Sequence, residues 1–133
     1  MVGRLLLGDS DRNQTLNLPP FPENFRRGNV CDVAGPSGVG KTQLLLTACA
    51  RTIIPKKYGG LGQCAVFIDS ELKFPAYRLI NMLENQLENQ KRHGPEIESE
   101  NTVNEVNDAL DPADSEQVVQ DALKRFYVIA TET

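Results

Sequence analysis

The sequence predicts an α/β fold with a mostly parallel sheet, and two observations carry that prediction. Short apolar runs of strand length alternate with longer segments of helical periodicity across residues 29–133. The glycine-rich stretch GPSGVGKT, residues 35–42, stands directly between the first apolar run and the first helical segment. With 133 residues, of which 40% are hydrophobic and 24% charged, the chain has enough sequence for one globular domain.

Residues 1–28 are expected to be an extended lead-in before this domain, because Gly, Asp, Asn and several prolines disfavour a helix there. Residues 29–34 (NVCDVA) predict a first strand that ends at the glycine-rich loop. Residues 41–52 (KTQLLLTACART) then predict a helix that is apolar nearly all round. The expected local order is therefore strand, loop and buried helix.

A second strand and a second helix are expected after a loop over residues 53–63. Residues 64–69 (CAVFID) form an unbroken apolar run, which suits a central strand of a parallel sheet with both faces covered. Phe74 and Pro75 open the next predicted helix, whose apolar positions fall on one face. The apolar face of this helix is expected to pack on the sheet.

The last expected elements are a helix that runs through Arg125 and a third strand at residues 126–130 (FYVIA). Asp114 or Ser115 is expected to cap that helix. The three predicted strands form an incomplete, mostly parallel sheet with flanking helices and an exposed edge.

The charge of the chain is unevenly distributed. The formal net charge is −4, and ten of the eighteen acidic side chains lie between Glu84 and Glu116. Residues 93–112 are rich in Glu, Asn, Asp and Ser with almost no bulky apolar residues, which predicts an acidic loop. The whole-chain balance lacks the strongly basic footprint of a nucleic-acid binder. No apolar run approaches the roughly 20 residues that a membrane-spanning helix needs, so we expect no membrane association.

The cysteines indicate neither a disulfide framework nor a zinc site, because they are odd in number and isolated from one another. Free cysteines are among the residues most often buried. We therefore expect all three to be buried, reduced thiols: Cys31, Cys49 and Cys64.

Residues 35–42 match the pattern G-x-x-x-x-G-K-[ST] in full. Glycines let the backbone N–H groups converge on phosphate oxygens, and the following helix presents its positive N-terminus to the same anion. Lys41 is expected to reach the β- and γ-phosphates, and the Thr42 hydroxyl to join the coordination shell of Mg²⁺. The expected phosphate-binding residues are Gly35, Pro36, Ser37, Gly38, Val39, Gly40, Lys41 and Thr42.

Hydrolysis of a nucleotide also needs a group that orients water and a carboxylate on the metal side. Two candidates stand at the carboxyl end of the strand CAVFID, where ligands of parallel sheets collect. Asp69 would be the metal-side carboxylate, and Glu71 would be the general base. The alternative for each is a solvated loop carboxylate.

From Gly28 to about Leu83 the chain resembles the RecA-like recombinases, and most closely the eukaryotic recombinase paralogs of the X-ray-repair cross-complementing group. The stretches GPSGVGKTQLLL and IPKKYGGLGQCAVFIDSE carry this resemblance, together with the F-x-x-x-R-L step at Phe74, Arg78 and Leu79. The resemblance implies a P-loop nucleoside triphosphatase of RecA type.

The family places its catalytic carboxylate after the second core strand, so the resemblance implies that Glu71 orients water while Lys41 and Mg²⁺ neutralise the charge of the ATP phosphates. Gln43 fits the recombinase form of the loop. Tyr58 holds the position of a side chain that stacks on adenine in the family. Leu72 departs from the family, which has Gly after the catalytic Glu.

The resemblance implies an ATP-binding paralog in DNA repair by homologous recombination, located in the nucleus. Its partners would be other paralogs or a recombinase filament, with single-stranded DNA contacted through the complex. The family's metal-side aspartate and DNA-contacting loops follow the strand that FYVIA matches, so the chain is expected to cover the N-terminal part of the ATPase core. The alternatives are a truncated, non-hydrolysing interaction module that holds nucleotide and docks on a partner, or a small-molecule P-loop kinase.

Overall fold

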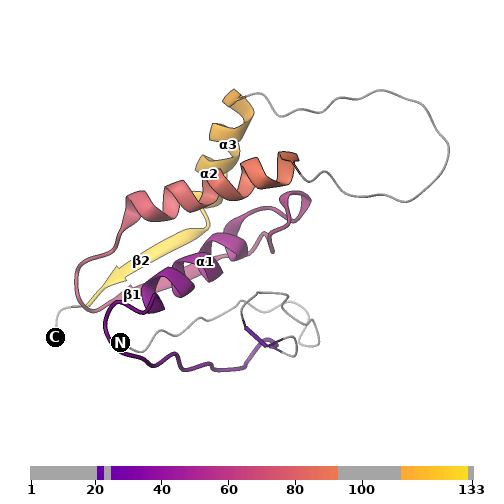
Figure 1. The fold of residues 1–133 in the computed structure, drawn as a ribbon. Helices are drawn as coiled ribbons and strands as arrows, with labels where there is room; N and C mark the ends of the chain where they lie inside the picture. Colours follow the sequence, from indigo (N-terminus) through magenta and orange to yellow (C-terminus); the bar gives the residue numbers. More distant parts are fainter. Residues whose placement is uncertain (1–20, 23–24, 93–111, 132–133) are drawn as a thin grey trace, which may run out of the picture.

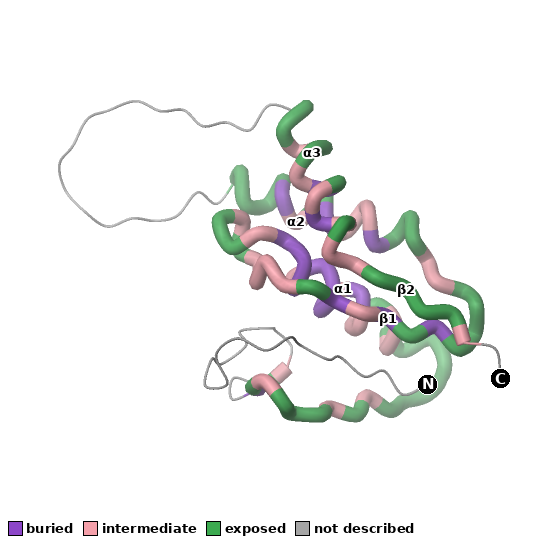
Figure 2. The backbone as a smooth tube through the Cα atoms, turned by 180° about the vertical axis from the view of Figure 1, so that it is seen from behind, coloured by how far each residue is buried: buried purple, intermediate pink, exposed green. Residues whose placement is uncertain are grey.

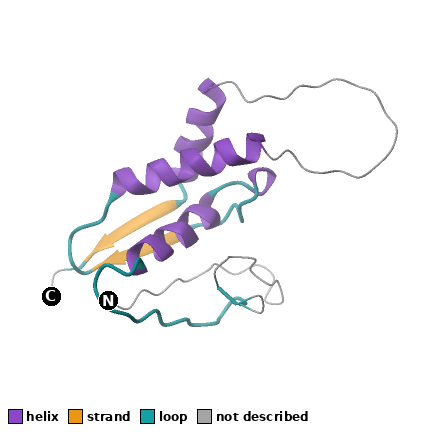
Figure 3. Ribbon diagram, viewed as in Figure 1, coloured by secondary structure: helices purple, strands orange, loops and turns teal. Residues whose placement is uncertain are grey.

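The computed structural model describes residues 21–22, 25–92 and 112–131. Within these ranges the chain forms α-helices, a short 3-10 helix and two strands, which Figure 3 distinguishes by colour. Their order along the chain is α1 (Lys41–Ile53), η1 (Lys56–Tyr58), β1 (Ala65–Asp69), α2 (Ala76–Arg92), α3 (Pro112–Leu123) and β2 (Phe126–Ala130).

The two strands lie side by side and are parallel, with Ala65 opposite Phe126 and Asp69 opposite Ala130. A parallel pair needs a crossover connection, which α2 and α3 provide here. The expected parallel α/β architecture is therefore confirmed for the described residues (Figure 1). The strand expected at residues 126–130 has the bounds of β2, and β1 begins one residue later than expected.

The hydrophobic core lies between the helices and one face of this sheet. Leucines spaced four residues apart on α2 bury one stripe of that helix, as its sequence pattern predicts. Phe74 links the two strands at the edge of the core, with ring centroids 5.1 Å from Phe67 and 5.4 Å from Phe126. The largest fully buried side chains are Leu46, Thr52, Ile53, Ile54, Leu79 and Leu83.

The opposite face of the sheet is largely exposed among the described residues, and Figure 2 shows the strands from that side. Paired residues of a parallel sheet share a face, so Val66, Ile68, Tyr127 and Ile129 form one apolar surface, here called the open face. Ile68 is 51% exposed and Tyr127 is 54% exposed. The expectation that the CAVFID strand is covered on both faces is therefore wrong for the described part of the chain.

Residues 29–34 do not form the expected strand. They are extended and lack strand pairing, and they run apart from β1 and β2 (Figure 1). A strand needs a neighbour for its backbone N–H and C=O groups, and an apolar run alone does not supply one. This segment instead contributes Cys31 to a small cluster with Phe21, Phe25 and Leu61, in which the two phenylalanine rings stack at 5.1 Å.

The last helix differs from expectation at both ends. It begins at Pro112, where the missing N–H of proline is tolerated, and not after a cap at Asp114 or Ser115. It ends at Leu123, before Arg125. The acidic loop expected over residues 93–112 lies outside the described residues up to Asp111, and so does most of the expected lead-in.

The cysteines among the described residues form no disulfide, in agreement with the sequence. Cys49 is buried, Cys31 is half-buried and Cys64 is exposed, so the expected burial is correct for Cys49 and wrong for Cys64. Burial of Cys49 raises the pKa of its thiol to about 12. In the described ranges no helix is both long enough and apolar enough to cross a membrane.

Candidate functional site

The glycine-rich loop turns directly into α1, and its geometry depends on glycine at two positions. Gly38 has φ +83° and Gly40 has φ +99°, a left-handed backbone that other residues rarely adopt. Gly40 is the N-cap of α1 and contributes no side-chain cap, while its carbonyl accepts the N–H of Leu44 at 2.9 Å. A helix leaves the N–H groups of its first turn without helical acceptors, so this end of α1 is suited to bind an anion.

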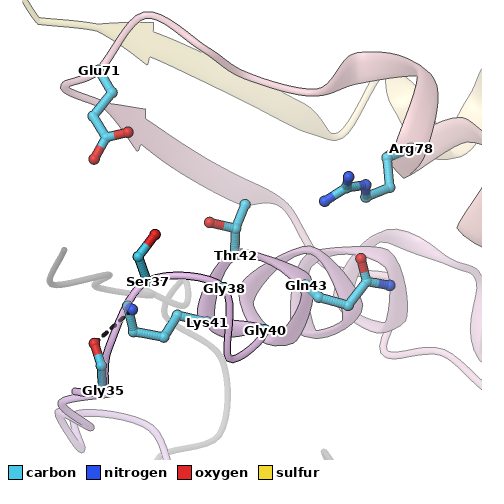
Figure 4. Close-up of a pocket in the computed structure, with 9 residues that line it drawn as sticks. All are labelled: Gly35, Ser37, Gly38, Gly40, Lys41, Thr42, Gln43, Glu71 and Arg78. Atoms are coloured by element: carbon cyan, nitrogen blue, oxygen red, sulfur yellow. Dashed lines mark hydrogen bonds between the residues drawn. The ribbon is translucent and has the colours of Figure 1, made fainter.

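Lys41 folds back over the loop. Its Nζ donates hydrogen bonds to the carbonyl oxygens of Gly35 and Pro36, both at 2.7 Å. Figure 4 shows the ammonium group on the concave side of the loop, beside Ser37. Two backbone carbonyl groups of the loop therefore hold the positive charge of Lys41 against the loop.

A cavity of about 510 Å³ lies over this loop. It is bounded by three separate elements: the loop with the first turn of α1, the turn after β1, and the first turn of α2 (Figure 4). Its lining residues are Gly35, Ser37, Gly38, Gly40, Lys41, Thr42, Gln43, Glu71 and Arg78. Of the residues expected to bind phosphate, Pro36 and Val39 belong to the loop without lining the cavity.

The two candidate carboxylates take different positions. Glu71 is exposed and lines the cavity, on the side facing Ser37 and Thr42 in Figure 4. Asp69 is 4% exposed and is not among the lining residues. Its Oδ1 accepts the backbone N–H of Glu71 at 3.2 Å. Asp69 is therefore a buried acceptor for the turn, and the alternative of a solvated loop carboxylate is wrong for this residue.

Arg78 lines the cavity and was not expected as a site residue. It lies in the first turn of α2, and its guanidinium points toward the loop (Figure 4). The sequence held one indication that Arg78 could reach the site. Arg78 follows Glu71 closely and stands near the start of a helix that is expected to pack on the same sheet. A second positive group in the cavity, in addition to Lys41, increases the attraction of the cavity for an anion.

Tyr58 does not line the cavity. It is half-buried, packs against the core, and has Lys57 Nζ 4.8 Å from its ring centroid. The expected adenine stacking by Tyr58 is therefore without support from this geometry. Among the described residues, no group of three or more His, Cys, Asp or Glu side chains gathers as a metal site. The cavity offers side-chain oxygens from the hydroxyls of Ser37 and Thr42, the amide of Gln43 and the carboxylate of Glu71.

Comparison with known proteins finds similarity to DNA repair proteins over part of the chain. No family model matches the chain. The chain is 37% identical over 92 residues to the DNA repair protein XRCC2 homolog of Arabidopsis thaliana, an alignment that covers 65% of this chain and 24% of the relative. It is 40% identical over 82 residues to DNA repair protein XRCC3 of Bos taurus, covering 57% of this chain and 24% of the relative.

A third relative comes from an archaeal organism. The DNA repair and recombination protein RadA of Haloquadratum walsbyi is 36% identical over 55 residues, covering 41% of this chain and 16% of the relative. The chain thus spans about a quarter or less of the length of these relatives. These matches, together with the parallel α/β fold and the glycine-rich loop before α1, show that the chain is similar to one part of the RecA-like recombinases.

Proposed function

We propose that this chain binds ATP with Mg²⁺ in the cavity over the glycine-rich loop and acts as a recombinase paralog in DNA repair by homologous recombination. One observation carries the proposal: the loop, Lys41, Thr42 and Glu71 share one cavity although they come from separate elements. The loop supplies donors for an anion, and Glu71 supplies the carboxylate that water activation requires.

The residues of the cavity suit a triphosphate in complex with a cation. The ammonium of Lys41 would transfer its hydrogen bonds from the carbonyls of Gly35 and Pro36 to phosphate oxygens. The Thr42 hydroxyl lies in the first turn of α1 and would hold Mg²⁺, which prefers oxygen ligands. When bound, Mg²⁺ supplies Lewis-acid neutralisation of the phosphate charge. Arg78 would contact the nucleotide from the opposite wall.

Turnover depends on Glu71. Its side chain lines the cavity from the turn after β1, at the carboxyl end of a parallel strand. There its carboxylate would accept a proton from, or orient, the water that attacks the γ-phosphate. Lys41 would stabilise the charge that develops on the transferred phosphoryl group.

The biological setting of the proposal comes from the relatives, whose names describe DNA repair and recombination proteins. We propose that the chain acts in the nucleus together with other recombinase paralogs or a recombinase filament. Single-stranded DNA would be contacted through that complex.

A second candidate function is a nucleotide-binding module that docks on a partner without hydrolysing ATP. The open face favours it, since Ile68, Tyr127 and Ile129 are each about half exposed. In this case ATP would bind as proposed above, but no turnover would be measured.

The test compares three chains by calorimetric titration with Mg²⁺ and ATP: wild type, Lys41→Ala and Lys57→Ala. Lys57 is a matched control, because it is an exposed lysine outside the cavity. Loss of a charge-assisted hydrogen bond corresponds to about 1.5–3 kcal/mol, so Lys41→Ala should weaken ATP binding at least about tenfold. Equal affinity in Lys41→Ala and wild type would refute the proposed site.

Phosphate release then separates the two functions. Glu71→Gln keeps the size of the side chain and removes its basicity, so it should bind ATP like wild type and lose turnover. If wild type and Glu71→Gln both bind ATP and neither releases phosphate above a no-protein control, the chain does not hydrolyse ATP and the second candidate function is favoured.

A further inference from the structure

We propose that Asp69 is a positioning residue: its buried carboxylate holds the turn that carries Glu71 into the cavity. This inference rests on the proposed function, because the role of Glu71 is itself part of that proposal. Asp69 is not expected to touch nucleotide or metal.

The first support is the way in which Asp69 is anchored. It is the last residue of β1, where Ala130 of β2 is its partner, and its carbonyl accepts the N–H of Thr131 at 3.2 Å. Its side chain is 4% exposed and turns back to accept the N–H of Glu71 at 3.2 Å. Both the backbone and the side chain of one buried residue thus connect the sheet to the turn.

The second support is the conformation of the turn. Leu72 has φ +56° and is the only described residue other than glycine with a positive φ. A left-handed backbone is unfavourable for a leucine. The side chain of Leu72 is 56% exposed, so its packing does not explain this conformation. The remaining contacts of the turn must therefore hold it, and the hydrogen bond from Glu71 to Asp69 is one of them.

The same geometry distinguishes positioning from metal binding. A metal-side carboxylate would line the cavity, and Asp69 does not. One of its oxygens is already an acceptor for a backbone donor of the chain. Positioning requires an acceptor oxygen at this place, whereas binding a cation favours a full negative charge.

Two substitutions separate these roles. Asp69→Asn keeps an acceptor oxygen and removes the charge, while Asp69→Ala removes both. The first readout is amide hydrogen exchange at Glu71, measured by NMR on the full chain without nucleotide. We expect protection in wild type and in Asp69→Asn, and exchange about fivefold faster in Asp69→Ala, as the loss of one hydrogen bond implies.

This readout decides the proposal even if Asp69→Ala does not fold. A Glu71 amide that exchanges in wild type as fast as in an unstructured peptide would overturn the proposal without any variant. Unchanged exchange in a folded Asp69→Ala chain would also overturn it.

The second readout is ATP turnover. We expect Asp69→Ala to lower kcat about fivefold with little change in KM, and Asp69→Asn to restore it. In a Glu71→Gln background, where turnover is already lost, Asp69→Ala should leave ATP affinity unchanged, because Asp69 is not expected to touch nucleotide or metal. Weaker ATP binding in that background, or an Asp69→Asn chain that needs more Mg²⁺ and turns over as slowly as Asp69→Ala, would overturn the proposal.

Failure of the proposed function gives a different result. A wild-type chain that binds no ATP would refute the nucleotide site, while amide exchange would still report whether Asp69 holds Glu71.

Discussion

Arg125 is expected to be a main support of the fold, because it connects the start of the β2 strand to two other elements. Its Nε and Nη2 both donate to the carbonyl of Ile53, the last residue of α1, at 3.0 and 2.7 Å. Its own carbonyl accepts the N–H of Ala65, the first residue of β1, at 2.9 Å. Arg125→Met would keep an unbranched side chain and the backbone bond while removing the guanidinium.

The expected loss follows from these contacts. A hydrogen bond to a charged group contributes about 1.5–3 kcal/mol, and both bonds here share one acceptor. Arg125 is only half-buried, so the lower end of that range applies, about 1.5 kcal/mol. A positive charge at a helix C-terminus adds about 0.5 kcal/mol. Arg125→Met should therefore reduce the free energy of unfolding by about 2 kcal/mol and lower Tm by about 10 °C.

Urea unfolding followed by circular dichroism measures this loss. Lys124→Met is the matched control, because Lys124 is exposed and forms a surface ion pair with Asp121 at 3.0 Å. Such pairs contribute less than about 1 kcal/mol. If Arg125→Met and Lys124→Met had the same unfolding free energy, the support assigned to Arg125 would be wrong.

Four further predictions concern packing and the cysteines. Gly60→Ala should lower the free energy of unfolding by about 3 kcal/mol in a thermal melt, because the new Cβ would overlap the Ile54 carbonyl oxygen and lie 2.6 Å from its carbon. Leu83→Ala should cost about 3 kcal/mol in urea unfolding, because Leu83 is fully buried between the helices and the sheet. At pH 8 a thiol reagent should modify Cys64 rapidly and Cys49 only on unfolding, because Cys64 is exposed and Cys49 is buried. The thiol pKa of Cys49 rises from 9.0 to about 12 in the fold, so as the pH increases the unfolded chain loses this proton first. The stability that Cys49 contributes is complete below about pH 9 and is lost as the pH rises toward 12.

Each of these predictions has a result that contradicts it. A Gly60→Ala chain as stable as wild type would mean that the backbone at Ile54 moves aside freely. A loss below about 1 kcal/mol in Leu83→Ala would mean that the helices close the cavity by collapsing. Equal labelling of Cys49 and Cys64 in the folded chain would contradict the burial of Cys49, and Cys49→Ala should remove its share of the alkaline loss of stability.

Local sequence patterns were sufficient to predict the α1 helix and the β2 strand. The helix after the glycine-rich loop was expected over residues 41–52 and α1 spans Lys41–Ile53. FYVIA was expected as a strand and is β2. Both segments have a dense apolar pattern and clear boundaries, which is the condition under which periodicity is informative.

Features that depend on distant residues were harder to predict. NVCDVA is as apolar as a strand, yet it has no strand pairing in the described structure. Arg78 reaches the cavity only because α2 packs across the sheet beside α1. The exposure of Cys64 follows from where β1 begins, one residue later than expected. No sequence pattern indicates that the carboxylate of Asp69 turns back to the Glu71 amide.

The parallel pairing of β1 with β2 has a consequence for the order of folding during synthesis. The ribosome releases β1 before α2 and α3, and β1 pairs in the described structure only with β2, which follows α3. Helices form locally within about a microsecond, whereas a strand must wait for its partner to be translated. The nascent chain therefore holds the backbone of β1 unpaired for seconds, at the translation rate of about 5–20 residues per second. During that interval β1 is available to a chaperone or to a strand of another protein, because β2 has not yet been made.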